Sequence, residues 1–492
     1  MKIFHFPYYI CLVPLFFVLH ACTVHWLYIE VPVLLLLAGK YMLAAALAFL
    51  FFYLLIKNRD KAACITFAIL FIHFFFPEVH ILIRKHSPWP FPGRYIFIIP
   101  LLVALVIFLF IRIRKSPRSY TGITRYLNIL LLILVIADLS VLVFRKINSS
   151  ARNLSLANSD IAISPCMDCP KPDIYFLVFD EYSSSASLKE DYGYDNQFLD
   201  SFLLKNGFKI QPESRSNYNS TAFSAASITN MSYLDIADTA AVTSIDYAHA
   251  ARLVGNSRLF SIMETMGYDI LNISLFDIKG SKAPVKFYHG KDVQEIIMSR
   301  TFTSRLLSEA GWNFLKKQQL RHISTLQSKG IQTIRMGIDT LKKISAEKGR
   351  SPRFIYSHLL MPHPPFLMNK AGPRTPEKVA ATPDSSVKEY LDYVFYTNTV
   401  IKEIITAIQD NTGGSSVIVI MSDHGFRHPA KATISTDLHF KIQNALYFPS
   451  GNYSRVYDSI SGVNQFRVVL NTLFRQNISL LPDQQFFLQA RK

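Results

Sequence analysis

The sequence predicts two parts of different fold class: an α-helical membrane domain of about five transmembrane helices, then an exported α/β domain with a mainly parallel sheet. Two observations predict this division. Half of the 492 residues are hydrophobic, and the long apolar runs all lie before residue 146. After that point, apolar runs of strand length alternate with segments of helical periodicity. We therefore expect a transmembrane domain over 1–146, a linker over 147–171 and a globular domain over 172–492.

The membrane domain is predicted from five apolar stretches. Each is about 17–25 residues long, which suffices for a helix to cross a bilayer. They cover residues 7–28, 36–56, 63–83, 95–113 and 126–144. The first could instead be a signal peptide, because Lys2 precedes it. It lacks a clear small-residue cleavage site and four more stretches follow, so a retained helix is favoured.

The orientation follows from basic residues in the short loops, because loops rich in Lys and Arg face the cytoplasm. Two alternate loops carry eight basic residues and the other two carry three. We therefore expect a multi-pass protein of the inner (cytoplasmic) membrane, with everything after residue 146 on the periplasmic or extracellular side. Arg145, Lys146 and Arg152 run against this bias. The richer loops contain Lys57, Arg59, Lys61, Arg112, Arg114, Lys115, Arg118 and Arg125; the others contain Arg84, Lys85 and Arg94.

The net charge of +17 suits a protein that works against anionic lipid headgroups. A basic chain can also bind nucleic acid. Here the basic residues are scattered and no nucleic-acid motif occurs, so we expect membrane lipids as partners and no nucleic acid.

Two of the five cysteines lie in the linker, as the "CMDC" motif of Cys166 and Cys169. A single C-x-x-C lacks the second pair that a tetrahedral zinc site needs. On the outer side of the membrane we expect a local disulfide, with a redox or metal role as the alternative.

The α/β prediction starts at Ile174–Phe179, "IYFLVF", whose continuous apolar character is typical of a strand buried on both faces. Residues 196–210 and 257–274 each contain a helical pattern, a glycine and a short strand. Residues 389–411 form an amphipathic helix that leads into the strand "VIVIM" at 417–421. A basic helical segment at 320–349 could lie over the core or against the membrane. This alternation predicts a parallel sheet.

Ligands of open parallel sheets gather beyond the carboxyl ends of the strands, and polar residues occur at three such ends. Asp180 and Glu181 follow the first strand, and Asp423 and His424 follow 417–421. A carboxylate with an imidazole suits zinc or manganese better than calcium. The structural alternative is a solvated polar turn at each end. We predict that Gly425 lets the backbone turn tightly beside this pair.

The third strand end is "HLLMPHPPF", where His358 is expected on the strand and His363 between two prolines. A histidine held in a rigid loop can donate a hydrogen bond to an oxyanion at little ordering cost. A purely structural histidine is the alternative.

A hydroxyl-rich stretch at 216–231 is read as a helix start near Thr221, capped by Asn219 or Ser220. Backbone N–H groups and the helix dipole stabilise an anion at such a position. A Thr221 oxygen beside a metal held by Asp180, Asp423 and His424 would lose its proton easily and act as a nucleophile. Capping alone is the structural alternative.

The order of these motifs resembles the sulfatase-like branch of the alkaline-phosphatase superfamily. The membrane-anchored lipoteichoic-acid synthases and the lipid A phosphoethanolamine transferases are the most similar in architecture, with five spans before an exported α/β domain. The resemblance makes residues 172–492 a sulfatase-like catalytic domain. It implies a divalent metal held by Asp423, His424 and either Asp180 or Glu181. Thr221 matches the transferases' nucleophile, with Ser220 and Ser224 as fallbacks. His363 matches a substrate-side histidine, and His428 and His439 are candidates for a further ligand.

One departure from the family pattern narrows the chemistry. Formylglycine sulfatases need Cys or Ser followed by x-P-x-R, and here the residues are "STAFSAAS". A hydroxyl nucleophile fits phosphoryl transfer better. We expect a phospholipid-headgroup unit, of phosphoethanolamine or phosphoglycerol type, to pass through a phospho-threonine to an envelope glycan or lipid acceptor. A phosphate- or sulfate-ester hydrolase is the runner-up, and an inactive membrane assembly or transport protein is the alternative from another class.

Overall fold

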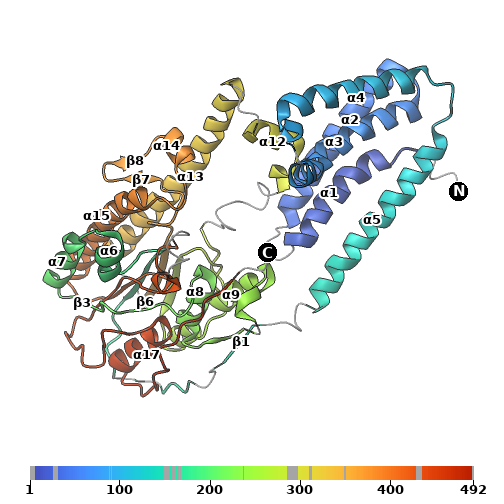
Figure 1. Cartoon of the computed structure of the whole chain (residues 1–492). Coiled ribbons are helices and arrows are strands. Elements are labelled where there is room, and N and C mark those ends of the chain that lie inside the picture. The colour runs from blue at the N-terminus through green and yellow to red at the C-terminus, as the bar shows by residue number, and fades with distance from the viewer. Residues whose placement is uncertain are drawn as a thin grey trace. The chain divides into compact units, whose positions relative to one another are not determined.

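The computed structural model describes residues 6–25, 31–87, 89, 91–148, 154–157, 161–164, 166, 168–236, 238–284, 297–309, 313–347, 349, 351–427 and 435–489. The chain divides into two compact units (Figure 1). One comprises Met1–Asn153 with Phe287–Gln319, and the other comprises Leu154–Lys286 with Leu320–Lys492. The segment from Phe287 to Gln319 thus groups with the N-terminal helices. The sequence predicts this segment as part of the globular domain over residues 172–492.

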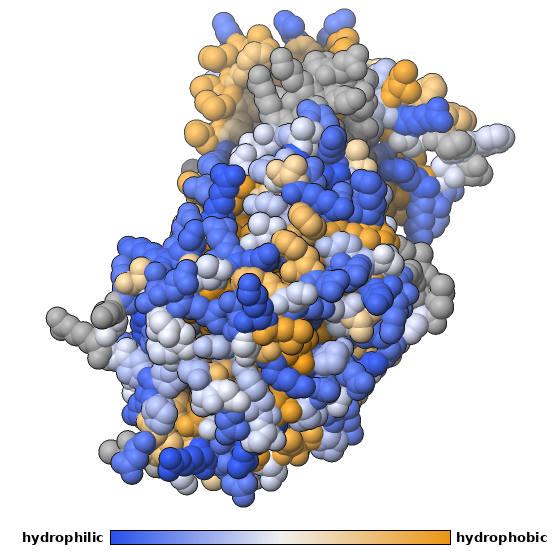
Figure 2. Space-filling model, turned by 90° about the vertical axis from the view of Figure 1, so that its left-hand side faces the viewer, coloured by the Kyte–Doolittle hydropathy of each residue, from blue (hydrophilic) through white to orange (hydrophobic). Residues whose placement is uncertain are grey.

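The first unit is helical and carries exposed apolar side chains, many of them leucine and phenylalanine, which appear in orange in the upper part of Figure 2. Four of its helices are long and apolar enough to cross a membrane, and the first is a shorter apolar helix of 17 residues. The length and composition of these helices identify a membrane protein. Its helices are α1 (Tyr9–His25), α2 (Val31–Ile56), α3 (Arg59–His86), α4 (Tyr95–Lys115), α5 (Thr121–Asn148) and α12 (Phe302–Glu309), with a 3₁₀ turn at Phe91–Gly93.

The second unit is built on a mainly parallel sheet, which confirms the predicted α/β class. The strand order is β3-β10-β9-β2-β6-β5. Strands β9, β2, β6 and β5 run parallel, and β10 is antiparallel to both of its neighbours. The strands are β2 (Ile174–Phe179), β3 (Lys209–Ile210), β5 (Asp269–Ile273), β6 (Arg353–Leu359), β9 (Val417–Met421) and β10 (Asn444–Tyr447).

Helices cover both faces of this sheet, so its central strands are buried on both sides (Figure 1). Alternate residues of β2 point to opposite faces because side chains alternate along a strand. Phe176 packs in one core with residues of α8, α10 and α17, and Leu177 packs in the other with residues of α7, α13 and α15. This two-sided burial explains the unbroken apolar run of β2.

The remaining elements of the second unit connect these layers. Its helices are α6 (Ser185–Tyr192), α7 (Gln197–Lys205), α8 (Thr221–Asn230), α9 (Ser244–Gly255), α10 (Arg258–Thr265), α13 (Asn313–Ala346, from Leu320 onward), α14 (Pro376–Ala381), α15 (Val387–Thr412) and α17 (Gly462–Leu473). Short strands are β1 (Ser155–Leu156), β4 (Leu234–Asp235), β7 (Met368–Asn369) and β8 (Gly372–Pro373), and 3₁₀ turns lie at Thr239–Ala241 and Thr436–His439.

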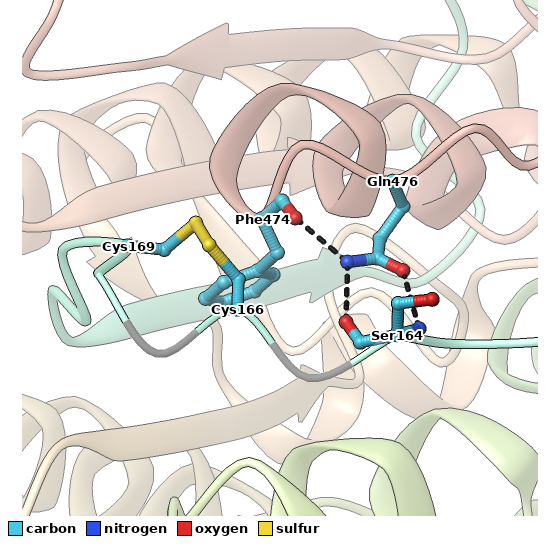
Figure 3. The surroundings of a disulfide bond; sticks show 5 residues. All are labelled: Ser164, Cys166, Cys169, Phe474 and Gln476. Atoms are coloured by element: carbon cyan, nitrogen blue, oxygen red, sulfur yellow. Dashed lines mark hydrogen bonds between the residues drawn. A yellow bond between two sulfur atoms is a disulfide. The ribbon is translucent and has the colours of Figure 1, made fainter.

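The segment predicted as a linker is attached to the second unit. Its β1 pairs antiparallel with β4. Cys166 and Cys169 form the expected disulfide (Figure 3). Beside it, the Ser164 N–H donates to Oε1 of Gln476 at 2.9 Å, and the Gln476 amide donates back to the Ser164 carbonyl at 2.8 Å. These amide hydrogen bonds hold the segment next to the end of α17, and the disulfide closes a short loop within the segment.

Candidate active site

Three neighbouring parallel strands bring polar residues to one edge of the sheet. In the register, Val178 of β2 lies opposite His358 of β6 and Met421 of β9. Asp180 is two residues beyond Val178, and Asp423 is two residues beyond Met421. Strand pairing therefore places Asp180, His358 and Asp423 together, where α/β sheets bind ligands.

These three side chains form a group with the spacing and chemistry of a metal site. One ligand atom from each lies within 4.8 Å of the others. All three residues are at most 2% exposed. Asp180 Oδ1, His358 Nε2 and Asp423 Oδ2 have no hydrogen-bond partner among the described residues. Unpaired carboxylate and imidazole atoms are costly to bury unless a cation binds them, so the group fits a divalent metal ion.

His424 adds a second imidazole to the edge of this group. Its Nε2 lies 3.4 Å from Oδ2 of Asp423 and 3.9 Å from Oδ1 of Asp180. Its Nδ1 faces the Gly425 carbonyl at 3.0 Å. A carbonyl only accepts, so Nδ1 carries the proton and Nε2 presents a lone pair towards the carboxylates. This orientation, with one ring nitrogen donating to a carbonyl, is typical of metal-binding histidines.

The predicted nucleophile lies beside His424. Thr221 is the first residue of α8, and its Oγ1 is 3.3 Å from His424 Nε2. Ser220 occupies the N-cap position, but its side chain makes no capping hydrogen bond. The first N–H groups of a helix have no acceptor within the helix, and here the cap side chain does not take them. Of the fallback hydroxyls, Ser224 is 1% exposed and donates to the Tyr218 carbonyl at 2.8 Å.

Asp423 also organises the loop around the site. Its Oδ1 accepts hydrogen bonds from the N–H groups of Glu181, at 3.1 Å, and His424, at 3.0 Å. Oδ2 is thereby left to face the metal group. The backbone of Gly425 passes so close to 438–441 that a Cβ atom would lie 2.2 Å from the Leu438 carbonyl oxygen. Glycine is therefore required for this close approach, whereas the sequence suggested a tight turn.

The adjacent carboxylates of Asp180 and Glu181 have different surroundings. Glu181 has a φ of 63°, the left-handed region that non-glycine residues rarely adopt. Its Oε1 accepts hydrogen bonds from the backbone N–H of Arg427 at 2.8 Å and from Nε at 3.1 Å. Burial opposes ionisation of Glu181, but the Arg427 guanidinium outweighs it and holds the pKa of this carboxyl below its usual value. Of the two alternatives for the metal carboxylate, Asp180 is the one that lies in the metal group.

His363 lies beside Glu181, and its imidazole also interacts electrostatically with Asp180. It follows a cis peptide bond between Met361 and Pro362, and its Nε2 is 3.5 Å from Oε2 of Glu181. The same Nε2 is 2.9 Å from Nη2 of Arg427. The predicted substrate-side histidine is thus close to the site, and its partner there is a guanidinium.

Of the two histidines proposed as further ligands, the structure describes only His439. His439 is 6% exposed, and neither ring nitrogen has a hydrogen-bond partner among the described residues. Burial, together with the nearby His424 and Arg427, lowers the pKa of His439 to about 4. His428 lies outside the described residues.

Two residues in this arrangement carried no assigned role in the sequence prediction. His358 was expected on the strand but not as part of a metal group, and Arg427 was not placed at all. The signal for His358 was a histidine within the otherwise apolar run "FIYSHL", a strand that is buried along its whole length. Arg427 gave no such signal, since its partners are distant in the sequence.

Comparison with known proteins assigns part of the second unit to a family. The family model described as Sulfatase matches residues 311–466, a range that contains His358, His363, Asp423 and His424. Asp180 and Thr221 lie before it. Among curated proteins, none matches the chain.

Several solved structures are similar to this chain at low sequence identity. The C-terminal periplasmic domain of EptC from Escherichia coli is 13% identical over 64% of this chain and 86% of that chain, with a TM-score of 0.37. The corresponding domain of the phosphoethanolamine transferase EptC from Campylobacter jejuni is 15% identical over 64% and 92%, with a TM-score of 0.36. The integral membrane lipooligosaccharide phosphoethanolamine transferase A (EptA) from Neisseria meningitidis is 11% identical over 94% and 95%, with a TM-score of 0.36.

The family match confirms the resemblance read from the motifs. The matched residues include two of the three strand ends that build the metal group. The part of the chain from 311 to 466 is therefore sulfatase-like, and apolar helices precede it in the sequence.

Proposed function

We propose that this enzyme is a membrane-anchored, metal-dependent phospho-group transferase. It moves a headgroup phosphoryl unit, of phosphoethanolamine or phosphoglycerol type, from a phospholipid to an envelope glycan or lipid. The observation that carries the proposal is the position of Thr221. Its hydroxyl lies at a helix N-terminus, 3.3 Å from His424 and at the edge of a buried group that fits a metal ion.

The first step is attack by Thr221 on the phosphorus of the headgroup. The Thr221 hydroxyl lies 3.3 Å from Nε2 of His424, beside the carboxylates that would hold the metal, and it gives up its proton as it attacks. A bond forms between Oγ1 and phosphorus, the bond to the lipid oxygen breaks, and diacylglycerol leaves with a proton. The N–H groups at the start of α8 donate to the phosphoryl oxygens as charge develops there.

The second step returns the enzyme to its starting state. An acceptor hydroxyl attacks the phospho-threonine, the bond between phosphorus and Oγ1 breaks, and Thr221 regains its proton. The residues suited to hold the metal are Asp180, His358, Asp423 and His424, and this mixture of oxygen and nitrogen ligands fits zinc or manganese. When bound, the metal supplies positive charge that favours loss of the Thr221 proton and stabilises the phosphoryl oxygens.

The membrane helices suit this reaction because both donor and acceptor are envelope molecules. The excess of basic residues in alternate loops supports a site on the periplasmic or extracellular side of the cytoplasmic membrane. A hydrolase of phosphate or sulfate esters is the second candidate, since the matching family model is that of the sulfatases. In that case water replaces the acceptor hydroxyl.

The test uses the full chain in detergent with phosphatidylethanolamine or phosphatidylglycerol labelled in the headgroup phosphate. We expect release of diacylglycerol and a labelled peptide that contains residue 221, identified by mass spectrometry. Thr221→Ala should abolish the label and lower turnover by at least about 1000-fold, because a covalent nucleophile is lost.

Two matched variants control this result. Thr221→Ser keeps a hydroxyl and should retain labelling, whereas Ser224→Ala removes a hydroxyl that is already engaged with a carbonyl and should change nothing. Label found only in small soluble products would indicate hydrolysis. Full labelling of the Thr221→Ala protein would refute the assignment of the nucleophile.

A further inference from the structure

Arg427 presents a guanidinium to the site that neither the metal group nor the nucleophile accounts for. It is fixed at one end by two hydrogen bonds to the same oxygen of Glu181, from the backbone N–H and from Nε. The Glu181 side chain is 2% exposed, and the Arg427 side chain is 36% exposed. No described residue accepts a hydrogen bond from Nη1 of Arg427. A buried carboxylate thus holds a guanidinium on a side chain that is partly exposed.

The contact with His363 shows which of the two residues can donate to a substrate. His363 Nδ1 faces the Pro364 carbonyl, which only accepts, so the ring proton lies on Nδ1. Nε2 then carries a lone pair and accepts from Nη2 of Arg427 at 2.9 Å. In this arrangement His363 offers no N–H to a bound anion. The guanidinium does, and His363 helps to orient it.

The charged groups of the site form two adjacent systems that also act on each other, with Asp180 in one and Glu181 in the other. Asp180 faces His358 and Asp423, whereas Glu181 faces Arg427 and His363. A divalent ion in the first system is balanced by the carboxylates of Asp180 and Asp423. In the second system, Glu181 balances Arg427. The site therefore has charged donors for an anion but no excess positive charge that would favour a second negative charge.

From this charge balance we propose that the Glu181–Arg427 pair determines substrate charge, so that the site selects singly charged esters over doubly charged phosphate monoesters. Arg427 donates to a non-bridging oxygen, and Glu181 repels the additional charge of a monoester. The inference rests on the proposed function, because a phospholipid headgroup is attached through a singly charged phosphodiester. The charges of Glu181 and Arg427 would then explain why the enzyme prefers a phosphodiester donor.

The test measures binding, independently of turnover. The full chain in detergent, with its metal, is titrated calorimetrically at pH 8 with methyl phenyl phosphate, a monoanionic diester, and with phenyl phosphate, a dianionic monoester. We expect the wild-type protein to bind the diester more tightly. Glu181→Gln should improve monoester binding relative to diester binding by about tenfold, the effect of one unit charge at roughly 10 Å in a medium with an effective dielectric constant near 20.

A second variant gives the opposite expectation. Arg427→Met leaves Glu181 uncompensated, so both ligands should bind more weakly and the preference for the diester should grow by about tenfold. This result stands even if Glu181→Gln fails to fold. Glu403→Gln, which removes a carboxylate from a surface pair with Lys342, should leave the ratio unchanged.

Two outcomes would overturn the inference. Either the binding ratio is unchanged in both variants, or folded Glu181→Gln loses its metal, which would make Glu181 a metal ligand. Absence of a labelled Thr221 would refute the proposed function and leave these binding ratios as they are.

Discussion

Replacing Asp423 by Asn should weaken metal binding strongly while keeping the fold. Oδ1 of Asp423 accepts hydrogen bonds from two backbone N–H groups, and the amide oxygen of Asn can accept both. Oδ2 has no hydrogen-bond partner among the described residues, and it lies 3.4 Å from Nε2 of His424. In the variant an NH₂ group occupies this place, and a donor cannot bind a cation.

The expected magnitude follows from the metal's contribution to stability. Loss of a residue that only supports a ligand weakens metal binding by about 10–100-fold, so loss of a ligand should cost at least about 100-fold. At a metal concentration of about 100 times the wild-type Kd, the ion stabilises the folded protein by about 2.7 kcal/mol. In Asp423→Asn the same concentration should stabilise it by only about 0.4 kcal/mol.

The assay compares the melting temperature of the full chain in detergent with and without added zinc or manganese, together with metal content. Without metal, Asp423→Asn should be at least as stable as wild type, because it removes one of two neighbouring buried carboxylates. Asp392→Asn, in a surface pair with Lys388, is the matched control and should keep the full metal response. A folded Asp423→Asn protein with wild-type metal content and the same rise in Tm would refute the metal group.

Two further predictions concern the sulfatase-like unit. Phe176→Ala should destabilise it by about 3–5 kcal/mol, measured by denaturant unfolding, because Phe176 is 1% exposed and its ring centroid lies within 5.0 Å of those of Tyr356 and Phe466; a loss below about 1 kcal/mol would contradict this packing. His439 has a folded-state pKa of about 4, against an ordinary value of 6.5. The stability that comes from burying its neutral form is therefore fully present above pH 6.5 and is lost as the pH falls towards 4. At pH 5 the free energy of unfolding should be lower by about 2 kcal/mol, and the His439→Gln protein should not show this decrease. If the free energy of unfolding of the two proteins changes equally with pH, His439 is not buried in the neutral form.

Much of the fold could be predicted because it rests on local patterns. The apolar lengths before residue 146 identify the membrane helices, and the unbroken apolar run of β2 identifies a strand covered on both faces. The α1 helix was the least certain of the membrane helices, since a short apolar helix near a basic N-terminus also resembles a signal peptide. The start of α8 at Thr221 was read correctly from the run of small and hydroxyl residues.

The chemistry of the site could be predicted only as a set of residue types at strand ends. Asp423 and His424 were found because a polar pair directly after a buried strand is unusual. His358 was missed as a possible ligand because its role depends on which strands are neighbours, and strand order is not a local property. The register of β2 with β6 and β9 is what brings His358 next to Asp180 and Asp423.

The sequence by itself determined the two-part architecture, the mainly parallel α/β class and the hydroxyl, carboxylate and imidazole groups available for chemistry. Only the tertiary structure decided between Asp180 and Glu181 as the member of the metal group, because a left-handed backbone at Glu181 turns these adjacent side chains into different surroundings. It also decided the partner of Arg427. That residue follows Glu181 by more than two hundred positions, and folding alone places its guanidinium against the buried carboxylate.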